Sequence, residues 1–153
     1  LSLHYREPKT DEYVRSYVNQ IGRQLIHDDL DQIVCGQLSC EDSALGKAKR
    51  MVFHDTNLLS SIIYAEHYFK AKTSLADGAF HSREYSLYLL CLPDGIDWKK
   101  DSGQRDSPLA RLCLHKKFKE NLDLMMLPYV EISGDKTTRL STSIKAINVL
   151  FKA

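Results

Sequence analysis

The spacing of hydrophobic positions predicts helices at several places along the chain. In residues 11–27 apolar side chains recur at helical spacing, with Thr10 as a cap and acidic residues in the first turn. Residues 56–71 have a wide apolar face, and Asp55 or Thr56 can cap them. The predicted helices cover residues 11–27, 42–51, 56–71, 116–127 and 138–151, and residues 29–38 fit either a short strand or a helical turn.

The remaining hydrophobic runs predict strands. In Tyr85–Leu92 both alternating sets of side chains are apolar, which is typical of a strand that is covered on both faces in the middle of a layered sheet. Shorter strands are expected over residues 109–114 and 129–133, and residues 97–107 read as a polar loop. Interleaved helices and strands predict an α/β or α+β fold, with helices packed on a small mixed sheet.

Composition fits one globular domain over residues 1–153, which we expect to be excised from a longer chain because it begins without Met. Hydrophobic residues make up 43% and charged residues 27%, and no apolar run is long enough to span a bilayer. The four cysteines have neither disulfide nor zinc spacing. They predict buried, reduced thiols in an intracellular protein, cytoplasmic or nuclear, without a metal or a cofactor.

The net charge of +1 conceals a basic segment between residues 99 and 119. Trp98 beside these cations fits a contact surface, since Trp and Arg are enriched where proteins bind, and it fits equally well a residue that covers the edge of the core. An acidic protein is the expected partner, and nucleic acid is an alternative. The predicted binding residues are Trp98, Lys99, Lys100, Arg105, Arg111, His115, Lys116 and Lys117.

His81 is the candidate catalytic residue. It follows the "ADG" turn signal and precedes the apolar run, and a neutral imidazole there could accept a phosphoryl group or act as a base. A turn histidine without a chemical role is the alternative.

The stretch "TSLADGAFH" resembles the active-site segment of mannitol/fructose-type IIA phosphocarrier domains of the bacterial sugar phosphotransferase system. "YSLYLLCLPDGIDW", "SPLARLCL" and "LSTSIKAINVLF" resemble later parts of the same family. The resemblance implies a mixed sheet flanked by helices, with His81 as the phosphorylated residue. The stretch is shorter than the family pattern and lacks a Pro before His81, which favours a regulatory relative.

His54 and Asp55 in "VFHDTN" could form a base or metal site, because a carboxylate orients imidazole in many sites. A capping role for Asp55 is the simpler interpretation. The chain has no Gly-x-x-x-x-Gly-Lys-Ser/Thr loop and no Gly-x-Ser-x-Gly elbow. The sequence therefore favours a non-catalytic interaction or regulatory domain, with a His81 phosphocarrier and a nucleic-acid-binding domain as alternatives.

Overall fold

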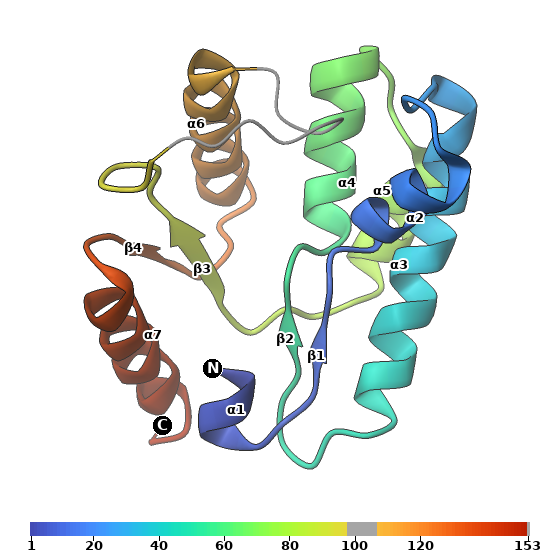
Figure 1. The fold of residues 1–153 in the computed structure, drawn as a ribbon. Helices are drawn as coiled ribbons and strands as arrows, with labels where there is room; N and C mark the ends of the chain where they lie inside the picture. The colour runs from blue at the N-terminus through green and yellow to red at the C-terminus, as the bar shows by residue number, and fades with distance from the viewer. Residues whose placement is uncertain (98–106, 153) are drawn as a thin grey trace. The chain divides into compact units, whose positions relative to one another are not determined.

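The computed structural model describes residues 1–97 and 107–152, which form two compact units. The N-terminal unit is Ser2–Glu84, and the C-terminal unit is Tyr85–Ala153 together with Leu1. Both units combine helices with a short parallel strand pair, which confirms the α/β class (Figure 1). One domain over residues 1–153 stays a prediction.

The N-terminal unit is a parallel strand pair joined by a helical crossover. Lys9 pairs with Phe53 and Thr10 with His54. Parallel strands need such a long connection, and here α2, η1 and α3 supply it. The elements in chain order are α1 (Ser2–Tyr5), β1 (Lys9–Thr10), α2 (Tyr13–Ile21), η1 (His27–Asp29), α3 (Leu30–Leu45), β2 (Phe53–His54), α4 (Leu58–Tyr64), η2 (Ala65–Phe69) and α5 (Ser74–His81).

Helix α3 is the centre of this unit, because it packs against α2, α4, α5 and β1 (Figure 1). Its buried residues follow one helical face and begin with Leu30, Ile33 and Val34. Opposite them, Leu58, Leu59 and Ile63 of α4 are fully buried. Burying large aliphatic side chains contributes roughly 1.5–3 kcal/mol each, so this helix pair holds the unit together.

The start of α3 is fixed by a buried carboxylate. Asp29 accepts hydrogen bonds from the Tyr17 hydroxyl at 2.8 Å and from the Ile26 backbone N–H at 2.9 Å. Arg23 donates to both of its oxygens, at 2.6 and 2.8 Å. The Arg23 guanidinium and these hydrogen bonds hold the pKa of Asp29 well below its usual range. Asp29 therefore ties α2 to α3.

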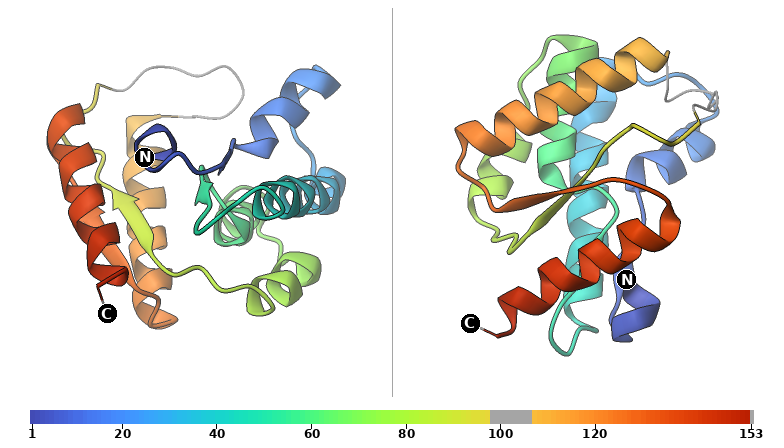
Figure 2. Two further views of the ribbon diagram at one scale, coloured as in Figure 1. Left: turned by 90° about the horizontal axis from the view of Figure 1, so that it is seen from below. Right: turned by 90° about the vertical axis from the view of Figure 1, so that its left-hand side faces the viewer.

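The C-terminal unit is a second parallel pair, β3 (Tyr88–Cys91) and β4 (Tyr129–Ile132), connected by α6 (Pro108–Leu124). Helix α7 (Lys136–Leu150) follows β4. Figure 2 shows α6 and α7 on opposite sides of this strand pair. Leu90, Leu122, Ile132 and Ile147 form its buried core.

Several element boundaries differ from the sequence prediction. Residues 109–114 are not a strand but part of α6, because Ser107 caps the helix by accepting from the Ala110 N–H at 3.0 Å and Pro108 suits the first turn. Residues 30–45 form one helix, and the "ADG" signal lies inside α5. Only Leu90 of β3 is buried, so this strand is less covered than its apolar sequence predicts.

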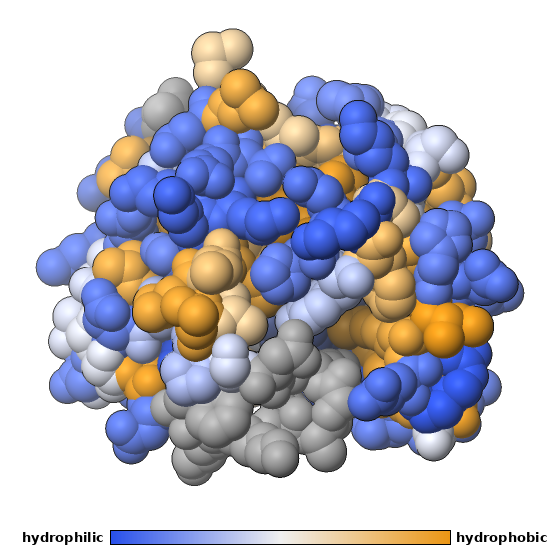
Figure 3. All heavy atoms as spheres, turned by 90° about the horizontal axis from the view of Figure 1, so that it is seen from above, coloured by the Kyte–Doolittle hydropathy of each residue, from blue (hydrophilic) through white to orange (hydrophobic). Residues whose placement is uncertain are grey.

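Two predictions about exposure can be compared directly with the structure. No described helix is long and apolar enough to cross a membrane. The four cysteines are free, but Cys35, Cys91 and Cys113 are exposed and Cys40 is half-buried, so the prediction of buried thiols is wrong. Hydrophilic residues predominate on the face in Figure 3, where exposed apolar side chains form separate areas.

We expect Asp29→Asn to destabilise the protein, because the amide cannot replace a carboxylate that pairs with Arg23. The folded pKa of Asp29 lies below the unfolded value of about 3.9, so its contribution is complete at neutral pH and is lost as the pH falls below about 4. Thermal unfolding followed by circular dichroism should show a large difference in Tm at pH 7 that narrows in acid. Asp28→Asn, at an exposed neighbour, is the control, and a difference that is independent of pH would contradict this role.

Candidate functional site

The best candidate site lies where β2 ends. Asp55 follows β2 directly, its backbone N–H donates to the Thr10 carbonyl at 3.0 Å, and its side chain is exposed. Among the described residues no hydrogen bond to its carboxylate is found. Asp11 raises the pKa of Lys9, and the negative charge of Asp55 adds a smaller contribution. An exposed carboxylate therefore stands at the carboxyl end of a parallel strand pair, the edge where α/β folds bind ligands.

The turn after Asp55 has an unusual backbone. Thr56 has φ +69°, in the left-handed region that β-branched residues rarely adopt. Asn57 then caps α4, because its side-chain oxygen accepts from the Leu59 N–H at 3.1 Å. The sequence assigned this cap to Asp55 or Thr56. Since Asn57 takes that role, the Asp55 carboxylate is left available for a ligand.

His54 faces the interior rather than the ligand edge. Its Nδ1 lies 3.0 Å from the Thr10 hydroxyl. Burial lowers the pKa of His54, the Glu41 carboxylate opposes that shift, and the Arg83 guanidinium adds to it. The lowered pKa favours the neutral ring, so His54 and Asp55 have separate environments and do not form the paired site that their adjacency suggested.

A buried polar chain lies behind the turn. The Gln37 side-chain amide donates to the Glu41 carboxylate at 3.0 Å and to the Thr56 carbonyl at 3.3 Å. Glu41 is only 1% exposed, and its second oxygen lies 3.4 Å from the Arg83 guanidinium. Arg83 also donates to Asp42 at 2.5 Å. Helix α3 is thereby connected through hydrogen bonds to the turn that presents Asp55.

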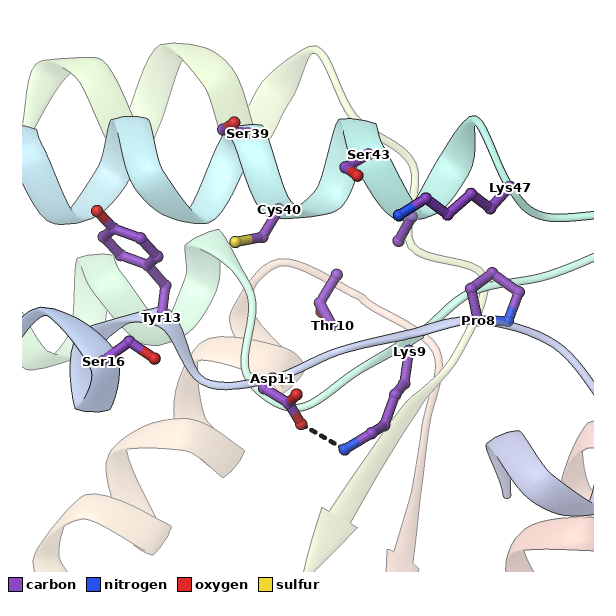
Figure 4. Close-up of a pocket in the computed structure, with 11 residues that line it drawn as sticks. Pro8, Lys9, Thr10, Asp11, Tyr13, Ser16, Ser39, Cys40, Ser43 and Lys47 are labelled. Carbon is purple, nitrogen blue, oxygen red and sulfur yellow. Dashed lines mark hydrogen bonds and ion pairs between the residues drawn. The ribbon is translucent and has the colours of Figure 1, made fainter.

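A groove of about 490 Å³ runs between β1 and α3 (Figure 4). Thr10 points toward α3, whereas Lys9 and Asp11 point to the other side of β1 and pair with each other. The Tyr13 ring lies directly over Gly36, where an added Cβ would overlap it. The groove is lined by Pro8, Lys9, Thr10, Asp11, Tyr13, Ser16, Ser39, Cys40, Ser43, Ala44 and Lys47. Hydroxyl groups are the most frequent polar groups among these side chains.

The carboxylate chemistry of this edge suits Mg²⁺ bound together with phosphate groups. Mg²⁺ keeps several waters and is usually held by one or two carboxylates plus substrate phosphates. Within residues 1–97 and 107–152, no three His, Cys, Asp or Glu side chains gather into a metal-binding cluster. A single available carboxylate, Asp55, fits the shared mode of binding and does not fit a metal cage built from protein alone.

The residues predicted from the sequence lie elsewhere. His81 ends α5 with an exposed side chain, and its ring meets Phe80 edge-on at 5.8 Å. Arg111 and Lys116, on α6, contact the Ile96 carbonyl at 3.0 Å and Glu120 at 3.6 Å respectively. His115 and Lys117 are half-buried on the same helix. Trp98, Lys99, Lys100 and Arg105 lie outside the described residues. A functional role for any of these residues stays a prediction.

Comparison with known proteins decides the family. A family model described as an AAA domain matches residues 1–139, which is most of the chain. The chain belongs to this AAA domain family. AAA domains are nucleotide-binding domains of the P-loop class, so the family agrees with a ligand edge that carries an exposed carboxylate.

Two solved structures have the same fold as this AAA domain. The crystal structure of NadR protein in complex with NR is 22% identical, with a TM-score of 0.77 over 92% of this chain. The structure of NadR protein in complex with NAD and AMP-PNP is 20% identical, with a TM-score of 0.79 over 95%. The chain spans 43% and 42% of their lengths, and no curated protein sequence matches it.

Membership of the AAA domain family corrects the functional predictions. The resemblance to IIA phosphocarriers is wrong, since the family match covers residues 1–139 and the supposed active-site turn is helix α5. The non-catalytic interaction domain, the His81 phosphocarrier and the nucleic-acid-binding domain are likewise replaced by a nucleotide-binding domain, and the preference against an enzyme is wrong.

Sequence reasoning noticed Asp55 but missed Gln37 and Glu41. A signal for Asp55 was present, because the apolar residues Val52 and Phe53 are followed by His54 and then by a carboxylate, as at the end of a short strand. Gln37 and Glu41 stand at helical spacing from Ile33 and Val34, on the apolar face of α3. Polar residues on such a face are buried, and buried polar residues need partners.

Proposed function

We propose that this chain is part of a phosphotransferase that binds a nucleoside triphosphate together with Mg²⁺. In the proposed reaction the bond between the terminal phosphorus and the nucleoside diphosphate breaks. A new bond forms to an acceptor oxygen, and the acceptor hydroxyl releases its proton. The observation that carries the proposal is the free, exposed Asp55 carboxylate at the end of a parallel strand in an AAA domain.

Asp55 is the residue to which we assign the metal. In P-loop proteins an Asp at the end of a core strand holds Mg²⁺, and a metal held by Asp55 would offset negative charge on the phosphate groups. Asp55 has the matching place, directly after β2, and Asn57 satisfies the cap that would otherwise occupy its carboxylate. Asp11 is less suited to this role, because Lys9 already pairs with it.

The proposal does not assign the phosphate cradle to these 153 residues. Gly46 and Lys47 are the only adjacent Gly-Lys pair, and they follow the carboxyl end of α3. A phosphate cradle needs the opposite end of a helix, where free N–H groups face the anion. The metal carboxylate and the groove are therefore the parts of the site that these residues supply.

The groove beside β1 is the proposed place for the phosphate acceptor. Its wall includes Thr10, whose carbonyl accepts from the Asp55 N–H, so the groove and the carboxylate share one strand end. Its hydroxyl lining suits a compound with several hydroxyl groups. NR, which is bound in one of the NadR structures, is the first acceptor to test. A nucleoside triphosphate substrate also agrees with an intracellular location. The cysteines predict that location, and we include it in this proposal.

Asp55→Asn tests the metal assignment. We expect it to weaken AMP-PNP binding in the presence of Mg²⁺ by roughly tenfold or more, equivalent to about 1.4 kcal/mol, because the amide is a poorer Mg²⁺ ligand. Binding without Mg²⁺ should be unchanged. Isothermal titration calorimetry of the whole phosphotransferase, phosphate cradle included, at several Mg²⁺ concentrations measures both. Asp28→Asn is the matched control, and equal Mg²⁺ dependence in wild type and Asp55→Asn would refute the assignment.

Ser43→Trp tests the groove. The bulky ring should fill part of the space beside α3 and weaken NR binding by roughly tenfold, or about 1.4 kcal/mol, while AMP-PNP binding stays the same. Calorimetric titration with NR provides the measurement. Ser74→Trp places the same side chain at the start of α5, outside the groove, and should leave NR binding unchanged. If the two variants bind NR equally well, the acceptor lies elsewhere.

The basic residues of α6 carry a separate proposal, an acidic partner. Lys116 is exposed, and its nearest acidic contact is Glu120 on the same helix. Reversing charge with Lys116→Glu and Lys117→Glu should reduce binding of polyglutamate roughly tenfold at low salt, since exposed charges act strongly only at low ionic strength. Fluorescence anisotropy measures this binding, with Lys136→Glu on α7 as control. Failure of the wild type to bind polyglutamate would end the proposal.

A further inference from the structure

The Asp55 turn contains a backbone conformation that its own sequence disfavours. Thr56 has φ +69°, although Thr is β-branched and the left-handed region crowds its side chain. Such a residue keeps this conformation only where the surrounding structure fixes it. Something outside the turn must therefore hold Thr56 in place.

Gln37 supplies that restraint. Its side chain is 3% exposed, and its amide nitrogen donates to the Thr56 carbonyl at 3.3 Å. The same nitrogen donates to Glu41 Oε1 at 3.0 Å, one helical turn further along α3. Both amide hydrogens thus have acceptors, which fixes the direction in which the Gln37 side chain points.

Glu41 and Arg83 stabilise the far end of this chain of contacts. Glu41 is 1% exposed, and its Oε2 lies 3.4 Å from an Arg83 guanidinium nitrogen. Arg83 also donates a hydrogen bond to Asp42 at 2.5 Å. The pairing with Arg83 allows Glu41 to be buried, because a buried carboxylate is tolerated only when it is paired. The restraint on Thr56 is therefore anchored in α3 and in the segment after α5.

The opposite sides of the turn are held as well. The Asp55 N–H is bonded to Thr10 of β1 at 3.0 Å, and Asn57 is fixed as the cap of α4. The Asp55 carboxylate takes part in none of these contacts. These contacts orient the backbone of Asp55 and leave its carboxylate oxygens available.

We propose that Gln37, backed by Glu41 and Arg83, is a positioning residue that holds the Asp55 carboxylate in its metal-binding orientation. This inference rests on the proposed function, because it assumes that Asp55 binds the metal. Gln37 touches neither the metal nor the substrate in this scheme. Gln37 acts through the backbone of Thr56. Without the hydrogen bond from Gln37, Thr56 relaxes to negative φ, and the Asp55 carboxylate turns away from the metal.

The test is Gln37→Met, which keeps the length of the side chain and removes both donors. Binding of Mn²⁺, as a probe for Mg²⁺, is measured in the presence of AMP-PNP by electron paramagnetic resonance, well below the Tm. We expect the affinity for Mn²⁺ to fall roughly tenfold, which corresponds to about 1.4 kcal/mol. Gln32→Met, an exposed position on the same helix, is the control and should bind Mn²⁺ as the wild type does.

A second variant separates positioning from general destabilisation. Asn adopts the left-handed region more readily than Thr, so Thr56→Asn should keep the turn in place without help from Gln37. In that background Gln37→Met should cost less than threefold in Mn²⁺ affinity. A merely structural role for Gln37 predicts the same loss in both backgrounds, and that result would overturn the proposal.

A readout without metal completes the experiment. The three-bond coupling between the amide and α protons of Thr56, measured by nuclear magnetic resonance, reports its φ and should change in Gln37→Met but not in Gln32→Met. If Gln37→Met folds poorly, Gln37→Asn replaces it, because the Asn side chain is too short to reach the Thr56 carbonyl. It should likewise change the Thr56 coupling and lower the affinity for Mn²⁺. Wild-type Mn²⁺ affinity in both Gln37 variants would overturn the inference.

The same experiments distinguish this inference from the proposed function. If Asp55→Asn weakens Mn²⁺ binding and the Gln37 variants do not, Asp55 holds the metal and only the positioning role is refuted. If Asp55→Asn has no effect on Mn²⁺ binding, the proposed function fails, and the positioning role of Gln37 fails with it.

Discussion

One face of helix α3 determines the organisation of the N-terminal unit. Leu30, Ile33 and Val34 are buried at its start, and Gln37 and Glu41 continue the same stripe. The apolar part packs the helix between its neighbours, which stabilises the unit through burial. The polar part cannot contribute in that way, because buried polar groups cost free energy unless they are bonded. Gln37 is bonded to the Thr56 carbonyl in the turn of residues 55–57, and Glu41 is paired with Arg83. The packing of the unit and the geometry of the site therefore depend on the same helix.

Parallel pairing explains why the candidate site lies where it does. Both strand pairs are parallel, so the carboxyl ends of the two strands lie at the same edge within each pair. Backbone N–H and C=O groups beyond the last inter-strand hydrogen bond are not used in strand pairing. At β2 that end is followed by Asp55, Thr56 and Asn57, each with a different role. Asn57 satisfies the start of α4, and Thr56 directs the chain through a left-handed turn. Asp55 is left with an unpaired charge at the ligand edge.

The sequence was most informative where local signals agree. Residues 129–133 and 138–151 were predicted as a strand and a helix, and β4 and α7 confirm them, because Gly134 allows the positive φ of the turn and Asp135 caps the helix. The single helix α3 was missed, since polar residues interrupt its apolar spacing and find their partners only in three dimensions. Asp55 was misinterpreted because Asp, Thr and Asn are all capping residues, and only the backbone of Thr56 decides between them.

The buried charges of the N-terminal unit follow a common rule that local patterns do not reveal. Asp29 and Glu41 are both almost fully buried carboxylates on or beside α3, and each meets an arginine from another segment, Arg23 and Arg83. Removing only one partner of such a pair is costlier than never having buried it. The Asp29 pair ends in hydrogen bonds between helices. The Glu41–Arg83 pair lies behind the strained turn before α4. There Glu41 accepts a hydrogen bond from Gln37, which also holds the Thr56 carbonyl. In our proposal this pair therefore helps to orient the Asp55 carboxylate, which it does not touch.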